Sequence, residues 1–184
     1  FRVLKKERKK LFAIFYVMVP LTFVFSSFAI YLPIYLRNQG YDFFTIALFS
    51  IVNVLPAFFV MPFGNFADKN GRMPVFLVGV LLLTVGLLFF YFSSMILSLL
   101  ICALIIGTGL ALLSPTANSL VGDLAKVGEK GVMSGVTETA KDLGQMIGPV
   151  LGGLVVELYD FPTLVLALSS IPVLILLLAL AFGR

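Results

Sequence analysis

The sequence predicts an all-α membrane protein with six transmembrane helices, on the basis of its composition, the length of its apolar runs and the placement of its charges. Of the 184 residues, 60% are hydrophobic and only 12% are charged. Soluble domains carry about 45–50% apolar and about 25% charged residues, and a chain of this length has too little interior to hide the excess. Its apolar surface is therefore expected to face the hydrocarbon of a lipid bilayer.

Six apolar runs divide the chain. Each reaches the ~20 residues that a helix needs to cross about 30 Å of hydrocarbon and exceeds the roughly 10 residues of a barrel strand. The connections are short, so consecutive helices should be antiparallel. The first run lacks the small-residue cleavage signature of a signal peptide. We predict a basic cytoplasmic linker at residues 1–10 and a six-helix transmembrane domain at residues 11–184, with spans at approximately 11–36, 43–67, 73–92, 95–121, 133–156 and 161–182.

Charge placement orients these helices. The basic residues outside the spans lie before the first span, in the loops after the second and fourth spans, and at Arg184. The loops after the first, third and fifth spans hold one basic residue, Arg37, and three acidic ones. By the positive-inside rule both termini are cytoplasmic. The basic start also suits contact with anionic lipid, which is compatible with this topology.

Several classes of function are disfavoured by what the chain lacks. It contains no histidine, and its single cysteine, Cys102, lies within an apolar run. This argues against disulfides, Cys/His metal sites and Ser-His or Cys-His nucleophiles. The basic residues lie between spans rather than on a soluble face, so nucleic acid is not an expected partner. We expect a protein that is not an enzyme and that uses no metal and no cofactor.

The loop between the second and third spans carries a distinctive motif. Residues 64–74 read Gly-Asn-Phe-Ala-Asp-Lys-Asn-Gly-Arg-Met-Pro. Gly64 is small enough for another helix to pass closely, and Gly71 permits the positive φ of a tight turn. Pro74 suits the first turn of a helix, where its missing N–H would be unpaired anyway. The segment therefore predicts a tight turn between two helices.

This loop resembles the signature G-x-x-x-D-[RK]-x-G-R-[RK] of the major facilitator superfamily, with Met73 in place of the second basic residue. The resemblance implies one half of a twelve-helix fold, covered by another six-helix half from the same polypeptide or from a second copy. It also implies that Asp68 pairs with Arg72 and meets the positive N-terminal end of a helix in the other half. The implied conformational latch comprises Gly64, Asp68, Lys69, Gly71 and Arg72. An ordinary cytoplasmic turn is the alternative.

A glycine-rich stretch occupies the fifth span. Residues 144–153 read Gly-Gln-Met-Ile-Gly-Pro-Val-Leu-Gly-Gly, which resembles the G-x-x-x-G-P-x-x-G-G motif of proton-coupled drug antiporters. Glycines four residues apart form a stripe that lets another helix approach closely, and proline interrupts the hydrogen-bond ladder. We predict a hinge or packing site, with close packing without a functional bend as the alternative. Its residues are Gly144, Gly148, Pro149, Gly152 and Gly153.

Three charged residues precede this stretch. Glu138, Lys141 and Asp142 share one side of the helix. With the span centred near Gln145, Asp142 lies ~5 Å and Glu138 ~10 Å from the bilayer midplane. Charges at this depth face a bundle interior or a water-filled cavity, where a partly dehydrated carboxylate can exchange protons. They are candidates for proton or charge coupling. The rival is a static ion-pair network, which the similarity of residues 141–144 to an R-D-x-G stretch of bacterial facilitators favours.

Polar residues inside the spans are candidates for lining a substrate cavity, each with an equal alternative as a hydrogen-bond partner between helices. They are Ser26, Ser27, Tyr31, Asn53, Asn118 and Gln145. So sparse a polar lining suits an amphipathic or hydrophobic molecule better than a sugar or phosphate.

The resemblance implies secondary active transport of a small molecule by alternating access, here as proton-coupled efflux. The expected location is the plasma (inner) membrane of a prokaryotic-type cell, and the expected partners are the bilayer, the substrate, protons and the other half. The basic start and the lack of an intramembrane arginine in the fourth span favour the C-terminal half. A non-transporting membrane scaffold or inactive half-module is the alternative function.

Overall fold

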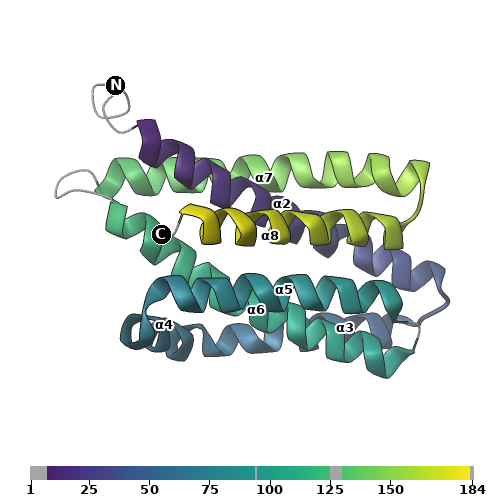
Figure 1. Ribbon diagram of the computed structural model, residues 1–184. Helices are drawn as coiled ribbons and strands as arrows, with labels where there is room; N and C mark the ends of the chain where they lie inside the picture. The colour runs from purple at the N-terminus through teal and green to yellow at the C-terminus, as the bar shows by residue number, and fades with distance from the viewer. Residues whose placement is uncertain (1–7, 94, 125–129, 183–184) are drawn as a thin grey trace.

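The computed structural model describes residues 8–93, 95–124 and 130–182 and forms a bundle of helices (Figure 1). The helices are α2 (Arg8–Asn38), α3 (Phe43–Val54), the 3₁₀ helix η1 (Leu55–Phe59), α4 (Val60–Asn70), α5 (Arg72–Phe92), α6 (Ile96–Leu124), α7 (Lys130–Leu158) and α8 (Phe161–Phe182). The start of α2 and the end of α8 lie at the same end of the bundle (Figure 1). Which side of a membrane this end faces stays a prediction.

The boundaries differ from the predicted ones at two places. The first helix already begins at Arg8, inside the predicted linker; residues 1–7 of that linker, Lys126 and Arg184 lie outside the described residues. The second predicted span is not one regular helix, because η1 separates α3 from α4. Pro56 supplies the reason, since proline has no N–H for the α-helical ladder.

Aspartates begin two of the helices in the same way. Asp42 accepts a hydrogen bond from the Thr45 backbone N–H at 3.1 Å, and Asp160 accepts one from the Thr163 N–H at 2.7 Å. These bonds satisfy N–H groups that a helix start leaves unpaired. Hydrogen bonding to Thr45 lowers the pKa of Asp42, and hydrogen bonding to Thr163 lowers the pKa of Asp160.

In the part of the chain that the structure describes, four helical segments are long and apolar enough to cross a membrane: Ile14–Asn38, Phe43–Asn70, Arg72–Phe92 and Ile96–Asp123. Within the described residues, Phe161–Leu177 is a shorter apolar helix. The remaining helix, α7, has 29 residues but carries five charged side chains. The protein is therefore all-helical with apolar spans, and its predicted fifth span is distinguished from the others by charge.

The helices pair according to a simple rule. α2 packs along α7, α6 packs against α3, η1 and α4, and α5 packs against both α6 and α8. The pairs are related by exchanging the first three predicted spans with the last three, so that α2 replaces α6, the second span (α3, η1 and α4) replaces α7, and α5 replaces α8. Under this exchange the α2–α7 pair becomes the pair of α6 with the second span, and the α5–α8 pair is unchanged. Figure 1 shows α5 and α8 in front of α6 and α2. The helix pairings are therefore repeated when the first three segments are exchanged with the last three.

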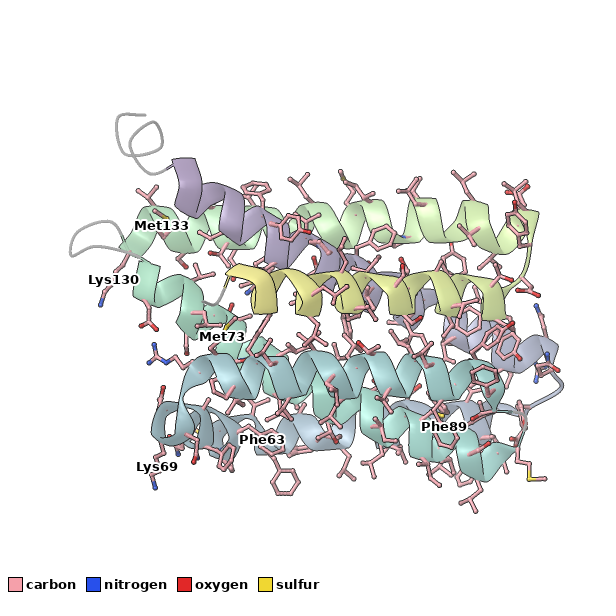
Figure 2. The ribbon with its side chains drawn as sticks, in the orientation of Figure 1. Phe63, Lys69, Met73, Phe89, Lys130 and Met133 are labelled. Atoms are coloured by element: carbon pink, nitrogen blue, oxygen red, sulfur yellow. The ribbon has the colours of Figure 1, made fainter. Side chains whose placement is uncertain are left out.

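Aromatic rings fill the core near the end of the bundle where α2 terminates. The ring centroids of Phe28 and Phe90 are 5.5 Å apart in an edge-to-face contact, and those of Tyr35 and Phe161 are 4.9 Å apart and stacked. Phe49 contacts Phe90 edge-on. Such offset and perpendicular arrangements are favourable for aromatic pairs. The cluster joins α2, α3, α5 and α8 at this end, whereas Lys69 and Lys130 lie at the opposite end (Figure 2).

The second span is the least covered part of the bundle. Of the apolar stretch in Phe43–Asn70, 11% is buried within the chain, against 50% for Arg72–Phe92 and for Ile96–Asp123. Phe58 and Met61 are each 83% exposed. Side chains of this size are not left to water over a whole helix, so lipid or further protein has to cover this face.

Candidate functional site

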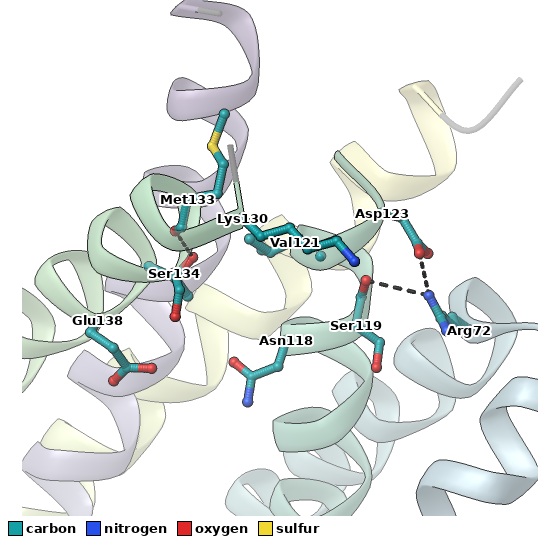
Figure 3. Close-up of a pocket in the computed structure, with 11 residues that line it drawn as sticks. Arg72, Asn118, Ser119, Val121, Asp123, Lys130, Met133, Ser134 and Glu138 are labelled. Atoms are coloured by element: carbon teal, nitrogen blue, oxygen red, sulfur yellow. Dashed lines mark hydrogen bonds and ion pairs between the residues drawn. The ribbon is translucent and has the colours of Figure 1, made fainter. Parts of the chain in front are cut away.

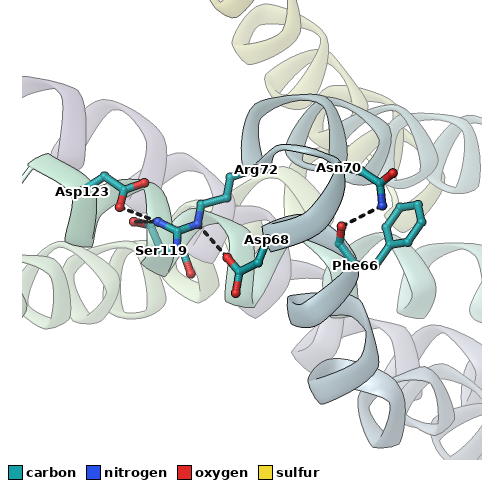
Figure 4. A network of polar contacts seen from close by, with 6 residues as sticks. All are labelled: Phe66, Asp68, Asn70, Arg72, Ser119 and Asp123. Carbon is teal, nitrogen blue, oxygen red and sulfur yellow. Dashed lines mark hydrogen bonds and ion pairs between the residues drawn. The ribbon is translucent and has the colours of Figure 1, made fainter.

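An arginine joins three helices at one end of the bundle (Figure 4). Arg72 Nε donates to Asp68 Oδ1 at 2.9 Å, and Arg72 Nη1 donates to Asp123 Oδ1. Nη1 also lies 3.5 Å from the Ser119 carbonyl oxygen. One guanidinium therefore links the end of α4, the start of α5 and the end of α6 in the forked manner that arginine geometry allows.

The turn that presents Arg72 has the predicted conformation. Gly71 has a φ of 94°, a value that side-chain-bearing residues rarely adopt. Pro74 lies in the first turn of α5, as predicted. A Cβ added at Gly64 would lie 3.9 Å from Pro115 Cβ, an ordinary contact, so a close helix approach at Gly64 stays a prediction for the other half. Lys69 is exposed.

Next to Arg72 a cleft opens between α6 and α7, which we call the polar cleft (Figure 3). Its volume is about 550 Å³. Glu138 and Ser134 project from α7, and Asn118 faces them from α6 (Figure 3). The lining residues are Arg72, Asn118, Ser119, Val121, Gly122, Asp123, Lys130, Met133, Ser134, Thr137 and Glu138. Charges of both signs therefore surround this space.

The charged residues of α7 do not form one triad. Lys141 Nζ pairs with Glu138 Oε1 at 2.8 Å. Asp142 is exposed on the bundle surface, and within the part of the chain that is described it makes no ion pair. Of the three residues predicted to interact, only Glu138 and Lys141 pair within the described residues.

The glycines of α7 form the seam between α7 and α2. Gly144, Gly148 and Gly152 are all buried. A Cβ at Gly144 would overlap Thr22 Oγ1, one at Gly148 would overlap Ser26 Oγ, and one at Gly152 would lie 3.2 Å from Ser27 Cβ. α7 and α2 therefore lie close together at these glycines, most tightly at Gly144 and Gly148.

Three hydroxyl groups of α2 cross this seam. Ser27 donates to the Gly148 carbonyl oxygen at 2.8 Å, Tyr31 to the Pro149 carbonyl oxygen at 2.7 Å, and Ser26 to the Gly144 carbonyl oxygen at 3.4 Å. A Cβ at Gly153 would overlap the Tyr31 hydroxyl. These three candidates for cavity lining are therefore partners between helices in this structure. The helix α7 continues through Pro149, so the predicted hinge stays a prediction.

The other three polar candidates lie apart from the seam. Asn53 donates through Nδ2 to the Ala103 carbonyl oxygen of α6 at 3.0 Å and lines a second cleft, between α2 and α3, of about 150 Å³. Asn118 lines the polar cleft. Gln145 is exposed on α7.

Asp123 is the site residue that the sequence reasoning missed. It was included in the loop region after the fourth span, although α6 extends through it. An acidic residue two positions after an apolar run, at the same predicted end of the bundle as Arg72, was the available signal. Its contact with Arg72 spans 51 positions, so only the packing of α6 beside α5 brings the two together.

Comparison with known proteins decides the family. The family model of the Major Facilitator Superfamily matches residues 14–184. The chain belongs to this superfamily. The residues that carried the resemblance, Asp68, Gly71 and Arg72, form the charged turn described above.

Three bacterial relatives illustrate the similarity. The chain is 28% identical over 141 residues to the multidrug resistance protein MdtG of Proteus mirabilis, covering 73% of this chain and 35% of the relative. It is 27% identical over 157 residues to the multi-drug resistance efflux pump PmrA of Streptococcus pneumoniae, covering 83% and 39%. It is 26% identical over 120 residues to the riboflavin transporter RibZ of Clostridioides difficile, covering 65% and 26%.

The aligned part of the chain spans between about a quarter and two fifths of these relatives. With its apolar helices and its family, the protein is an integral, multi-pass membrane protein of the bacterial plasma-membrane type.

Proposed function

We propose that this chain is the C-terminal six-helix half of a secondary transporter that exports small amphipathic or hydrophobic molecules in exchange for protons by alternating access. The resemblance to drug efflux pumps supports export, and the sparse polar lining of the spans supports a lipophilic substrate. In this proposal all six helical segments cross the bilayer, and the end that carries Lys69 and Lys130 faces the cytoplasm, in accordance with the positive-inside rule.

The observation that carries the proposal is the exposed charge on α7. Glu138 is 62% exposed at its side chain, and Asp142 is exposed a turn further along, within the predicted fifth span. A charged side chain near the middle of a bilayer costs several kcal/mol when it faces lipid. We therefore infer that a second six-helix half, on the same polypeptide or from a second copy, covers this face and encloses a water-filled path. Met146 and Val150, 65% and 64% exposed on the same helix, would pack against that half.

Asp142 is the stronger candidate for the coupling carboxylate. Glu138 already pairs with Lys141 at 2.8 Å. Asp142 has no such partner within the described residues, so we assign the proton exchange to it. Glu138, at the wall of the polar cleft, would connect Asp142 with the cytoplasmic side.

Proton-coupled transport in liposomes tests this assignment. The complete transporter and the variants Asp142→Asn, Glu138→Gln and Glu157→Gln are reconstituted, and substrate-dependent proton movement is measured with an internal pH dye. Asp142→Asn should reduce coupled proton movement at least about tenfold, and Glu138→Gln should reduce it less. Glu157→Gln is the matched control, because it removes a carboxylate from the other end of the same helix. Full coupling in both Asp142→Asn and Glu138→Gln would refute the proton role.

We also propose that the Asp68–Arg72–Asp123 network and the glycine stretch around Pro149 act as latch and hinge. The exposure of Asp68 (56%) and Asp123 (59%) leaves both carboxylates accessible to a helix N-terminus of the other half. A latch that forms in one conformation only would change the distribution between inward-open and outward-open states. Distance measurements between spin labels across the two halves, in the wild type and Asp68→Asn, would detect that shift. An unchanged distribution would instead support an ordinary turn, as in a non-transporting scaffold.

A further inference from the structure

A second cleft, between α2 and α3, has the size and lining of a pocket for a single ring; we call it the apolar cleft. Its volume is about 150 Å³. Its floor is made by Phe28, Leu83, Leu87 and Ile106, which are 5%, 1%, 0% and 1% exposed. These four side chains make the bottom of the cleft entirely apolar.

The mouth of the cleft is open. Phe25 and Val54 are 46% and 57% exposed, and Ala29 and Ser50 are also exposed. Ser50 Oγ donates to the Ile46 carbonyl oxygen of its own helix at 3.0 Å. Its contribution to the cleft is therefore its small size, which keeps the space between α2 and α3 free.

We propose that the apolar cleft holds one aromatic ring of the transported molecule. An apolar cavity of about 150 Å³ stays dry and accepts benzene, whereas whole drug-sized ligands need about 300–1,000 Å³. The cleft is thus a subsite: one ring enters it, and the rest of the ligand extends past the mouth. This inference rests on the proposed function and specifies its substrate class.

The lining selects an aromatic ring over an alkyl chain. Phe25, Phe28 and Phe49 contribute three rings, and aromatic pairs in edge-to-face or offset geometry gain energy beyond their buried area. Asn53 also lines the cleft, with its Nδ2 bonded to the Ala103 carbonyl oxygen of α6.

The wall that carries Asn53 is fixed in place. A Cβ at Gly107 of α6 would overlap the Asn53 carbonyl oxygen, so the two backbones touch there. Together with the Asn53–Ala103 bond this holds α3 against α6 at the depth of the cleft. The site is therefore preformed, and binding needs little reorganisation.

Polar residues also distinguish this cleft from a plain lipid-facing groove. Asn53 lies about 5 Å, at 1.5 Å per residue, from the middle of the segment Phe43–Asn70. Polar side chains at such depth generally face protein or an aqueous cavity rather than acyl chains, and Asn53 meets this condition through its bond to the Ala103 carbonyl oxygen. The occupant that we favour is a ligand that reaches the site through the interior of the transporter, and occupation by lipid is the outcome that would overturn it.

Binding measurements on the complete transporter in lipid nanodiscs test the proposal. The probes are radiolabelled tetraphenylphosphonium and tetrabutylphosphonium, which share charge and overall shape but differ in aromatic against alkyl arms. The wild type should bind the aromatic probe about tenfold more tightly, equivalent to about 1.4 kcal/mol. Ser50→Leu and Ala29→Leu fill the mouth from opposite walls and should abolish this preference. Asn53→Leu should reduce it.

The matched control is Ala47→Leu, which adds the same side chain to an exposed position of α3 outside the lining. It should leave both dissociation constants unchanged. Equal binding of the two probes by the wild type, or a preference that survives both filling variants, would overturn the proposal and leave the cleft to lipid. Transport of the aromatic probe, measured separately in liposomes, tests the proposed function. If the probe is transported but the filling variants keep the binding preference, the subsite is refuted and the proposed function is not.

Discussion

The polar cleft and the apolar cleft occupy related places in the bundle but have opposite chemistry. Exchanging the first three spans with the last three carries the α2–α3 gap onto the α6–α7 gap. One gap holds Arg72, Asp123 and Glu138, and the other is lined chiefly by aromatic and aliphatic side chains. The two gaps thus correspond in the order of their helices, but one is a charged cleft of about 550 Å³ and the other an apolar cleft of about 150 Å³.

Each cleft also depends on a glycine crossing that fixes one of its walls. Gly107 holds α3, a wall of the apolar cleft, against α6, whereas Gly148 holds α7, a wall of the polar cleft, against α2. Both crossings include a side chain that donates to a backbone carbonyl oxygen of the partner helix: Asn53 to Ala103 and Ser27 to Gly148. The two crossings differ in what a larger residue would meet.

The largest effect is expected for Gly107→Ala. Its new Cβ would overlap a backbone oxygen of α3, which cannot rotate away, so α3 and α6 have to separate. We expect a loss of about 3 kcal/mol, at the upper end of overpacking costs, and a disturbed apolar cleft. Thermal unfolding in detergent measures it, with Gly122→Ala as the control, because that position has nothing within 4 Å on the same helix. A melting temperature equal to that of Gly122→Ala would contradict the crossing.

Gly148→Ala should be less severe, at about 2 kcal/mol. Its nearest neighbour is Ser26 Oγ, a side-chain atom that can turn aside, while the Phe23 carbonyl oxygen lies 2.9 Å from the added Cβ. Gly135→Ala is the control, since that part of α7 is open. If Gly148→Ala proves as destabilising as Gly107→Ala, the distinction between side-chain and backbone contact at the two crossings fails.

Asp123→Asn tests the charged edge of the polar cleft. Arg72 and Asp123 are 32% and 59% exposed at their side chains, so the pair contributes at most about 1 kcal/mol to stability. Transport should fall more than stability does, because Arg72 loses the partner that fixes it between α5 and α6. Parallel measurement of melting temperature and initial uptake separates these effects. Ser119→Ala serves as the control, since only its carbonyl oxygen contacts Arg72. A change in stability without a change in transport would show that the Asp68–Arg72–Asp123 network has only a structural role.

The smallest effect is expected for the pH dependence of stability that comes from Asp160, just before α8. The pKa of Asp160 is lowered by its bond to the Thr163 N–H. A lowered folded-state pKa stabilises the protein above the unfolded-state value and loses that contribution as pH falls through the folded-state value. Stability should therefore decline slightly below about pH 4. Asp160→Asn, which keeps a capping side chain, should flatten this decline; an unaltered acid limb in melting curves would contradict the assignment.

Interactions between residues close in the sequence were predictable, whereas interactions between distant residues were not. The charged turn was predictable because Asp68, Gly71 and Arg72 are within four positions of one another, so local geometry alone brings them together. The glycine stripe was predictable because four-residue spacing places Gly144, Gly148 and Gly152 on one face whatever that face meets. The pairing of Arg72 with Asp123 was not, since it joins residues 51 positions apart.

The sequence by itself determined the helical, membrane-embedded class of this protein, because apolar run length and charge placement act through the bilayer and need no partner helix. Only the tertiary structure decided which polar residues face neighbouring helices and which face a cleft. Ser27 and Asn118 are both polar residues within predicted spans. Ser27 is fully buried against the Gly148 carbonyl oxygen, whereas Asn118 lines the polar cleft. The reason is that a side chain's surroundings in a bundle are set by helix pairing, which periodicity within one helix does not specify.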